Sequence, residues 1–282
     1  MQPDITLSFD TLPSTPLHSL FRIHRGKTLP IIQATCSHVT PFDVQRYNEI
    51  CNFTIQREHL AFTYPQLLAA PLHYQIVAHP QFPFPAIGLV HVEQHITYHS
   101  PIPNNTSLSI ITWCDNLHQV RSGHHFSLHT EVYHQEKLLW KGESVVLTRK
   151  LEGHKGKKIP AEKKDFSYSH TKTCPVPENQ GRIYAGVSKD WNLIHVHWTF
   201  AKLFGFQRAI VHGMWTLAIA ISWAEEQGLV IEKCHAKFVR PVFLPSTIKL
   251  ALHKESDTTS YLHILREKDE KKHLQITLQT SS

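Results

Sequence analysis

The chain has 282 residues, of which 41% are hydrophobic and 10% aromatic, so it can form one large domain or two of ordinary size. No apolar run reaches the length of about 18–20 residues that a transmembrane helix needs. The first residues have neither the basic nor the apolar region of a signal peptide. The five cysteines are scattered and never form a C-x-x-C pair. We therefore predict a cytoplasmic protein with reduced thiols and no membrane span.

The net charge of +6 favours anionic partners in a general way. Much of it lies in the run GHKGKKIPAEKKD, residues 153–165, where no aromatic side chains alternate with the lysines. We interpret this run as a solvated linker and expect no nucleic-acid partner. The 23 histidines lack the spacing of a metal motif such as H-E-x-x-H. His195 and His197 could chelate an ion from one face of a strand, but no third ligand is evident nearby, and we expect no metal.

The first half of the chain predicts one buried helix followed by strands. A strand is expected at residues 27–39, followed by a helix in TPFDVQRYNEICNF with Thr40 as its cap and Pro41 at its first position. The segment from Thr63 to Ala78 has the apolar density of a helix that is buried on most sides. Segments of alternating polarity then predict antiparallel strands at residues 87–99, 106–114, 124–134 and 137–149.

The second half repeats this order of elements. A buried helix is predicted from Gly213 to Gly228, and strands are predicted at residues 233–245, 247–255, 260–268 and 272–280. An antiparallel sheet wrapped around one buried helix, made twice, indicates an α+β double hot-dog fold. We expect an N-terminal hot-dog domain in residues 1–150, a linker in residues 151–181 and a C-terminal hot-dog domain in residues 182–282.

Polar residues interrupt an apolar stretch at SKDWNLIHVH, from Ser188 to His197. Asp190, Asn192 and His195 stand among Trp, Leu, Ile and Val, so the stretch should be at least partly buried. Buried polar groups are costly unless they are hydrogen-bonded. Taken singly, Asp190 would more often cap a turn and His195 would more often be a hydrogen-bonded core histidine. Their joint spacing favours catalysis.

The region from Tyr184 to Met214 resembles the MaoC-like, (R)-specific enoyl-CoA hydratase family of the hydratase 2 type. The family pattern is S-x-D-x-N-x-x-H, then A-x-x-x-G/A-F, then I-x-H-G-M. The matching residues are Ser188, Asp190, Asn192, His195, Ala201, Gly205, Phe206, Ile210, His212, Gly213 and Met214. Two positions depart from it, because Lys189 replaces the common Gly and Leu193 the common Pro. Lys189 could shift the pKa of Asp190.

The resemblance implies a hot-dog hydro-lyase that adds water reversibly across a trans-2-enoyl thioester to give an (R)-3-hydroxyacyl thioester. Such an enzyme serves fatty-acid or polyketide-type acyl metabolism, uses no cofactor, and acts on an acyl-CoA or acyl-carrier-protein thioester. Asp190 and His195 would be catalytic. The substrate would be bound by Ser188, Asn192, His212, Gly213 and Met214. The first half has no D-x-N-x-x-H and would be a degenerate hot dog that widens the acyl pocket.

The chemistry agrees with these residue types. Hydration needs a base that activates water and an acid that protonates the α-carbon, and one Asp/His pair can hold a single water for both. Asn192 is neutral and can orient the substrate without competing for protons. Gly213 opens the predicted buried helix, so its N–H can point at the thioester oxygen with the helix dipole behind it. We interpret His212 as a structural group that holds the loop before this helix.

Two other functions stay open. A hot-dog thioesterase would need a carboxylate on the buried helix, and Glu225 and Glu226 lie at the far end of that helix. A non-catalytic acyl-thioester binder is disfavoured by the presence of both Asp190 and His195. A homodimer also stays open, although two fused hot dogs already form the usual dimer-like unit.

Overall fold

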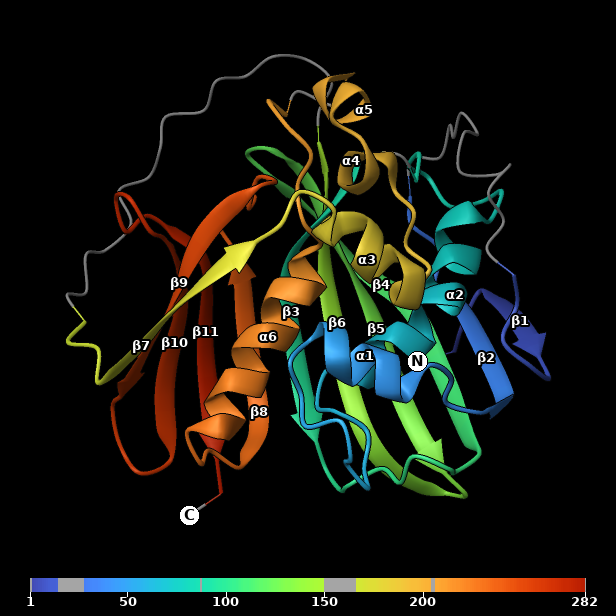
Figure 1. The fold of residues 1–282 in the computed structure, drawn as a ribbon. Coiled ribbons are helices and arrows are strands. Elements are labelled where there is room, and N and C mark those ends of the chain that lie inside the picture. The colour runs from blue at the N-terminus through green and yellow to red at the C-terminus, as the bar shows by residue number, and fades with distance from the viewer. Residues whose placement is uncertain (1, 15–27, 87, 150–165, 204–205, 282) are drawn as a thin grey trace.

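The computed structural model describes residues 2–14, 28–86, 88–149, 166–203 and 206–281 (Figure 1). The strands are β1 (Ile5–Phe9), β2 (Ile32–Val39), β3 (Leu89–Tyr98), β4 (Leu108–Val120), β5 (Gly123–His134), β6 (Lys137–Arg149), β7 (His170–Val176), β8 (Ile231–Phe238), β9 (Ser246–Lys254), β10 (Thr259–Arg266) and β11 (Lys272–Thr280). The helices are α1 (Val44–Ile50), α2 (Tyr64–Ala78), α3 (Gln180–Ser188), α4 (Leu193–Val196), α5 (Trp198–Leu203) and α6 (Gly213–Glu226). Among these helices, none combines the length and apolar character that a membrane crossing requires.

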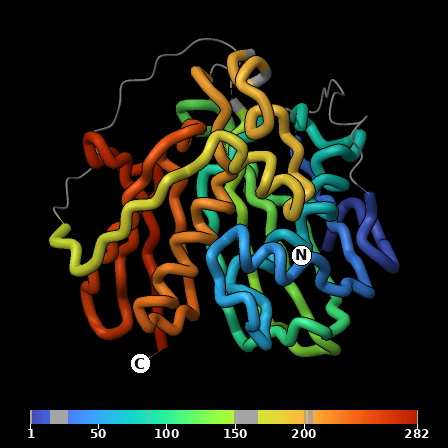
Figure 2. The backbone as a smooth tube through the Cα atoms, in the orientation of Figure 1, coloured from blue at the N-terminus to red at the C-terminus, as the bar shows by residue number. Residues whose placement is uncertain are grey.

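The strands of the described residues form one sheet in the order β1-β2-β4-β5-β6-β3-β8-β11-β10-β9-β7. Apart from β1, which pairs parallel with β2, all neighbours are antiparallel. The two sides of the sheet mirror each other, because β2-β4-β5-β6-β3 corresponds to β7-β9-β10-β11-β8. In each half the first strand, β2 or β7, is followed along the chain by a short helix, α1 or α3, and then by a long buried helix, α2 or α6. This arrangement confirms the predicted double hot-dog fold (Figure 2).

The two long helices are apolar on nearly every side, as their composition predicts. α2 packs against β2, β4 and β5, and α6 packs against β8 and β10. Leu68, Leu72 and Ile76 of α2 are fully buried, and so are Leu217 and Ile221 of α6. A helix covered all round in this way has no polar stripe, which explains why both segments could be recognised from apolar density alone.

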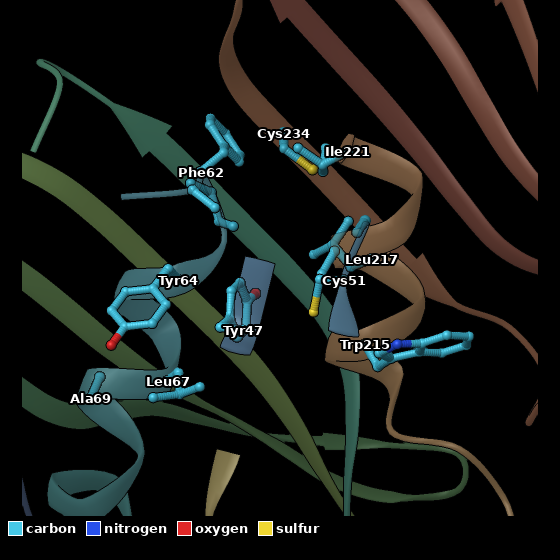
Figure 3. Packing of buried hydrophobic residues seen from close by; sticks show 14 of the residues in the cluster. Tyr47, Cys51, Phe62, Tyr64, Leu67, Ala69, Trp215, Leu217, Ile221 and Cys234 are labelled. Carbon is cyan, nitrogen blue, oxygen red and sulfur yellow. The ribbon is translucent and has the colours of Figure 1, made fainter. Parts of the chain in front are cut away.

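The two halves meet along β3 and β8, which pair antiparallel with His95 opposite His235. Side chains continue the junction beneath the sheet: the indole N–H of Trp215 on α6 donates to the carbonyl of Ile50 at the end of α1 (3.0 Å). In Figure 3, Tyr47 and Cys51 lie between Tyr64 and Leu67 on one side and Trp215 and Leu217 on the other. The buried apolar residues of both halves therefore form one continuous core.

A buried polar network fixes α2 to its sheet. The hydroxyl of Ser144 on β6 donates to Gln94 of β3 (2.8 Å) and accepts from Gln66 of α2 (3.2 Å). About two turns further along α2, His73 pairs with Thr130 of β5 (2.8 Å), and burial lowers the pKa of His73 to about 3. The imidazole is therefore neutral at physiological pH, so the network carries no buried charge.

Several boundaries differ from the prediction. Helix α1 begins at Val44 after Asp43, whose φ is 53°, so Thr40 and Pro41 lie outside it. The strand expected at residues 233–245 ends at Phe238, because the next two N–H groups both turn to the carbonyl of His273. The phenolic O–H of Tyr64 donates to the carbonyl of Phe42 and holds the chain before α1 in place.

The segment expected as a linker contains an edge strand. β7 pairs with β9 from His170 to Val176, so these residues belong to the second half of the sheet, and α3 begins soon after, at Gln180. The basic run at residues 153–165 lies outside the described residues. β7 consists mainly of polar residues and threonine, and most of them are exposed, as is usual for an edge strand. Because it has no alternating apolar residues, the sequence did not predict it as a strand.

A chain that begins at Phe166 should be insoluble or inactive, because it would expose the β8 edge and the flank of α6 that packs on α1. Expression of residues 166–282 and sedimentation of the lysate test this expectation. A soluble fragment with the turnover of the whole chain would show that the first half is dispensable.

Candidate active site

The turn after α3 presents Asp190. Lys189 ends the helix in the left-handed conformation, with φ of 58°. The backbone N–H of Asp190 then donates to the Ser188 hydroxyl (3.3 Å), and the N–H of Asn192 donates to Oδ1 of Asp190 (3.1 Å). The side chain of Asn192 in turn accepts from Ile194 N–H (3.4 Å) and caps α4. The polar residues of this stretch therefore satisfy one another and the backbone, which is a common use of Ser, Asp and Asn in turns.

His195 on α4 is held from two sides. Its ring Nδ1 donates to the carbonyl of Ile210 (2.8 Å), and the N–H of Ile210 donates to the carbonyl of Ile194 (3.1 Å). On the other side α3 approaches closely, because a Cβ on Gly181 would lie 1.9 Å from the carbonyl oxygen of His195. With Nδ1 carrying the proton, Nε2 of the neutral ring has the lone pair. The free lone pair of the His195 ring therefore lies on one defined nitrogen.

His212 precedes α6 and closes the site against Asp190. Its Nε2 donates to the backbone carbonyl of Asp190 (2.9 Å) and lies 3.8 Å from Oδ2 of the same residue. Its ring stacks on His195 with the centroids 3.8 Å apart. This hydrogen bond ties the Asp190 turn to the start of α6, as the interpretation of His212 as a structural group requires.

Tyr74 comes from the first half of the chain and was missed by sequence reasoning. Its phenolic O–H, on α2, donates to Oδ1 of Asp190 (2.9 Å). The carboxylate therefore has two donors on one oxygen, the Asn192 N–H and the Tyr74 O–H. Nothing local to Tyr74 marks it, because it lies in an apolar helical run and meets Asp190 only through the packing of the two halves. The site is thus composite.

The electrostatics leave one charge in the site. Burial raises the pKa of Asp190, but the His212 and His195 rings and the two hydrogen bonds lower it more, so it lies below its usual value. Burial lowers the pKa of His195 despite the opposing charge of Asp190. Burial and the neighbouring His195 lower that of His212 to about 3. At neutral pH the site therefore holds a carboxylate between two neutral imidazoles.

Lys189 contacts groups other than Asp190, whose pKa it was expected to shift. Its ammonium donates to the carbonyl of Gly186 (2.7 Å) and pairs with Asp43 (3.4 Å). The groups that lower the pKa of Asp190 are the ones named above, and Lys189 is not among them.

The spacing of the three groups suits one water molecule. Asp190, His195 and His212 each have one side-chain oxygen or ring nitrogen in the group, and these three atoms lie within 4.8 Å of one another. When one water donates to two acceptors at about 2.8 Å each, the two acceptor atoms lie about 4.5 Å from each other. The same distances also meet the requirement of a metal site. His197, whose ring accepts from the Thr199 N–H, is not part of this group.

Gly213 and Met214 begin α6 beside this group. The first N–H groups of a helix have no intrahelical acceptor, so that of Gly213 is suited to an external oxygen. A Cβ on Gly213 would meet the ring of Phe238 at 3.0 Å, so the glycine also allows that ring to lie close. Met214 is half-buried and packs on the core. Ala201 is buried, whereas Gly205 lies outside the described residues.

The carboxylates at the other end of α6 are engaged elsewhere. Glu225 pairs with Arg57, and Glu226 pairs with Lys172 (3.0 Å). Neither therefore supplies the carboxylate that the thioesterase alternative needs beside Gly213.

In the first half, the segment between α1 and α2 corresponds to the segment between α3 and α6, but it carries no counterpart of Asp190, His195 or His212. A left-handed residue follows each short helix, Lys189 directly after α3 and Asn52 one residue beyond Cys51 after α1, and Phe53 comes next in the first half as Asp190 does in the second. The N–H of Leu60 donates to the carbonyl of Ile102 as that of Val211 donates to Val242. By this register Ala61 corresponds to His212 and Phe62 to Gly213. The first half reaches that point without any counterpart of α4 and α5.

A pocket of about 490 Å³ opens beside α4 and α5. It is lined by Glu178, Arg182, Val196, His197, Trp198, Lys202, Gln207, Arg208, Ala209, Leu244 and Pro245. Arg182 donates to the carbonyl of Val196 (3.2 Å) and Arg208 to that of Pro245 (3.2 Å), so both guanidinium groups are held at the wall. Three cationic side chains against one carboxylate make the pocket suitable for an anion.

Comparison with known proteins shows the family to which the chain is related. Residues 158–273 match the family model described as MaoC like domain. The chain is 30% identical to 3-hydroxyacyl-thioester dehydratase X of Mycobacterium tuberculosis over 213 residues, and this alignment covers 75% of this chain and 76% of that protein. It is 27% identical over 157 residues to peroxisomal enoyl-CoA hydratase 2 of Arabidopsis thaliana, about half of each chain. The crystal structure of HtdX from M. tuberculosis superposes with a TM-score of 0.77 at 25% identity, over 88% of this chain and 100% of that one.

Replacement of Tyr74 by Phe should raise the pKa of Asp190, because the lost O–H donor stabilises the charged carboxylate. A hydrogen bond to a charged group contributes about 1.5–3 kcal/mol, so the shift should be about one unit or more. Carbon-13 NMR of the Asp190 carboxyl carbon across a pH titration measures it. Tyr133→Phe is the matched control, since Tyr133 donates to Glu131 elsewhere on the first sheet. An unchanged Asp190 pKa in Tyr74→Phe would contradict the contact.

Proposed function

The chain belongs to the MaoC-like dehydratase family, and on this premise we propose that it catalyses the reversible hydration of trans-2-enoyl thioesters to (R)-3-hydroxyacyl thioesters. The observation that carries the proposal is the spacing of the Asp190 carboxylate and the neutral His195 ring, whose side-chain atoms lie within 4.8 Å of each other, a distance that one bridging water can span. The relatives named as a thioester dehydratase and an enoyl-CoA hydratase support it.

In this proposal His195 carries the proton. Both Asp190 and His195 accept a hydrogen bond from the water, but the imidazole is the stronger base because the pKa of Asp190 is held low. As the water oxygen bonds to the β-carbon, Nε2 of His195 takes one of its protons. The imidazolium, stabilised by the carboxylate of Asp190, then delivers that proton to the α-carbon. The two steps together add one water, and dehydration is their reverse.

Negative charge develops on the thioester oxygen between these two steps. The N–H of Gly213 at the start of α6 is the donor proposed for it, with the helix dipole aligned behind. Tyr74 and Asn192 act on Asp190 and are positioning residues. Ser188 has the same role through the backbone N–H of Asp190.

The pocket beside α4 is proposed to hold the phosphates of the acyl carrier. Coenzyme A and an acyl-carrier protein both present a phosphopantetheine arm, and Arg182, Lys202 and Arg208 offer cationic donors for its phosphates. We also keep as proposals a cytoplasmic location, which the five free cysteines support, and a homodimer, which sedimentation would test.

Asp190→Asn and His195→Ala should each lower the turnover of crotonyl-CoA by about two to four orders of magnitude with little effect on folding. The double variant should be scarcely slower than either single one, because both groups act on one water. Loss of the enoyl-thioester absorbance measures hydration, and a thiol reagent in a parallel assay measures hydrolysis. Release of free thiol by the parent enzyme would indicate a thioesterase instead. Additive losses in the double variant would contradict the shared water.

Gly213→Val should reduce turnover by about 10²–10³, the usual effect of losing one oxyanion donor. The added side chain also presses on Phe238, so Phe238→Leu and the double variant Gly213→Val/Phe238→Leu serve as controls. If relief of the ring restores the melting temperature but not turnover, the loss is due to the thioester oxygen. Near-parental activity of Gly213→Val would place the oxyanion donor elsewhere.

Arg208→Gln should raise KM for crotonyl-CoA about tenfold and leave kcat unchanged, because a lost contact to a phosphate weakens binding before the chemistry. The same variant should act normally on crotonyl-pantetheine, which has no phosphate. Arg240→Gln is the matched control, since Arg240 donates to the Lys272 carbonyl outside the pocket. Equal effects on both substrates would contradict a phosphate-binding role.

A further inference from the structure

The outer face of the junction between the two halves carries an ordered group of side chains. The residues of β3 and β8 that face the helices are buried, and they are Gln94, Ile96, Cys234 and Ala236. Successive side chains of a strand point to opposite faces, so Glu93, His95 and His235 project from the face away from α2 and α6. His95 and His235 lie directly opposite each other, His95 from the first half and His235 from the second.

Three potential metal ligands converge at this point. Oε2 of Glu93 lies 2.8 Å from Nε2 of His235 and 3.6 Å from Nε2 of His95, and one donor atom of each residue lies within 4.8 Å of the others. The two imidazole rings are stacked with their centroids 4.0 Å apart. Zinc bonds of about 2.0–2.2 Å in a tetrahedral site place neighbouring donor atoms about 3.3–3.6 Å apart. The two rings are only 16° from parallel and their nitrogen lone pairs lie in the ring planes, so the rings must also rotate for both to point at one ion.

We propose that Glu93, His95 and His235 form a site for a divalent transition-metal ion such as Zn²⁺. Two imidazoles and one carboxylate suit zinc, cobalt and nickel, whereas calcium and magnesium prefer sets made only of oxygen ligands. The ion replaces the hydrogen bond between Glu93 and His235. Three protein ligands leave at least one coordination position for water or an added ligand.

The site is open to solvent from the outer face. The side chains of His95, His235 and Glu93 are 41%, 35% and 28% exposed, so a hydrated ion can reach them without opening the core. A hollow of about 170 Å³ adjoins His235 and is lined also by Lys237, Tyr261 and His263. The remaining coordination position therefore borders a recess in which water can be held.

Lys237 competes with the ion. Its ammonium lies 3.5 Å from Oε1 of Glu93, the oxygen that does not contact the histidines. A positive charge so close to the carboxylate repels a divalent cation and weakens binding. This contact makes the proposal specific, because removal of Lys237 must strengthen binding if Glu93 is a ligand.

Binding here would join the two halves of the chain. Glu93 and His95 belong to β3, and His235 belongs to β8, so one ion bridges the strand pair that unites the two halves of the sheet. The three ligands converge only when these strands are paired, and an ion that binds only the folded state raises the melting temperature. The site does not include Asp190 or His195, so turnover should not depend on the ion.

Calorimetric titration of the full chain with Zn²⁺ tests the proposal. One equivalent should bind saturably, and either His95→Gln or His235→Gln should weaken binding at least about 100-fold, because loss of a ligand exceeds the 10–100-fold loss caused by a supporting residue. Lys237→Gln should bind several-fold more tightly. His129→Gln is the matched control, since His129 is a partly exposed histidine that pairs with a carboxylate, Asp115, on the first sheet.

The second metal-compatible group of the described residues is the active site, which Asp190→Asn tests. This variant should bind Zn²⁺ like the parent. Zn²⁺ should raise the melting temperature of the parent and of His129→Gln by a few degrees and leave that of His235→Gln unchanged, and Co²⁺ should give visible absorption bands that His235→Gln lacks. The proposal is overturned by parental binding in the His95 and His235 variants, by loss of binding in Asp190→Asn, by unchanged or weaker binding in Lys237→Gln, or by no saturable binding to the parent.

Discussion

The pairing of β3 with β8 is the interaction on which the active site depends. It joins two half-sheets into one, so α2 and α6 are buried in a common core. Only in that arrangement does Tyr74 of α2 reach Asp190 of the second half. The first half therefore contributes to the site through packing, although its own sequence contains no catalytic motif. Either half alone would present an unpaired strand edge and the apolar flank of a helix to water.

Burying the carboxylate of Asp190 is the main electrostatic cost of the site. The side chain of Asp190 is 31% exposed, so its charge loses only part of its hydration, and two hydrogen bonds and the nearby imidazoles offset that loss. The same burial keeps His195 and His212 neutral. A low-pKa carboxylate beside a neutral imidazole is the arrangement on which the proposed role of His195 as the proton carrier rests. The polar residues inside the apolar stretch are thus both satisfied in the fold and available to chemistry.

The sequence was sufficient wherever the signal is local. Apolar density located α2 and α6, and the spacing of Asp190, Asn192 and His195 located the catalytic turn. Contacts between distant segments could not be predicted. Tyr74 meets Asp190 only after the halves dock, and Gly181 matters only because α3 approaches the carbonyl of His195.

The group of Glu93, His95 and His235 has the same origin. Its members meet across a strand register that no linear motif records, so a search for metal-ligand spacing along the chain finds nothing. The start of α1 was misplaced for a related reason. Asp43 takes a left-handed conformation, and the preceding residue is anchored by Tyr64, a residue of α2 far along the chain.

The two halves have kept one architecture and divided its chemistry. Phe53 replaces the carboxylate of Asp190, and a phenyl ring at Phe62 stands where Gly213 leaves space at a helix start. Tyr74 and Glu225 are separated by the same number of residues as Leu60 and Val211, so they occupy equivalent positions on α2 and α6.

In the second half Tyr74 donates to the carboxylate of Asp190, whereas in the first half Glu225 pairs with Arg57, whose guanidinium lies 5.2 Å over the ring of Phe53. A helix of each half thus reaches across to the other at equivalent positions, once to orient a reactive carboxylate and once to form an ion pair. Both positions therefore carry a contact between the two halves. Only the second half has the turn with Asp190 and the longer path through α4 that supplies His195, the two residues that are proposed to act on water.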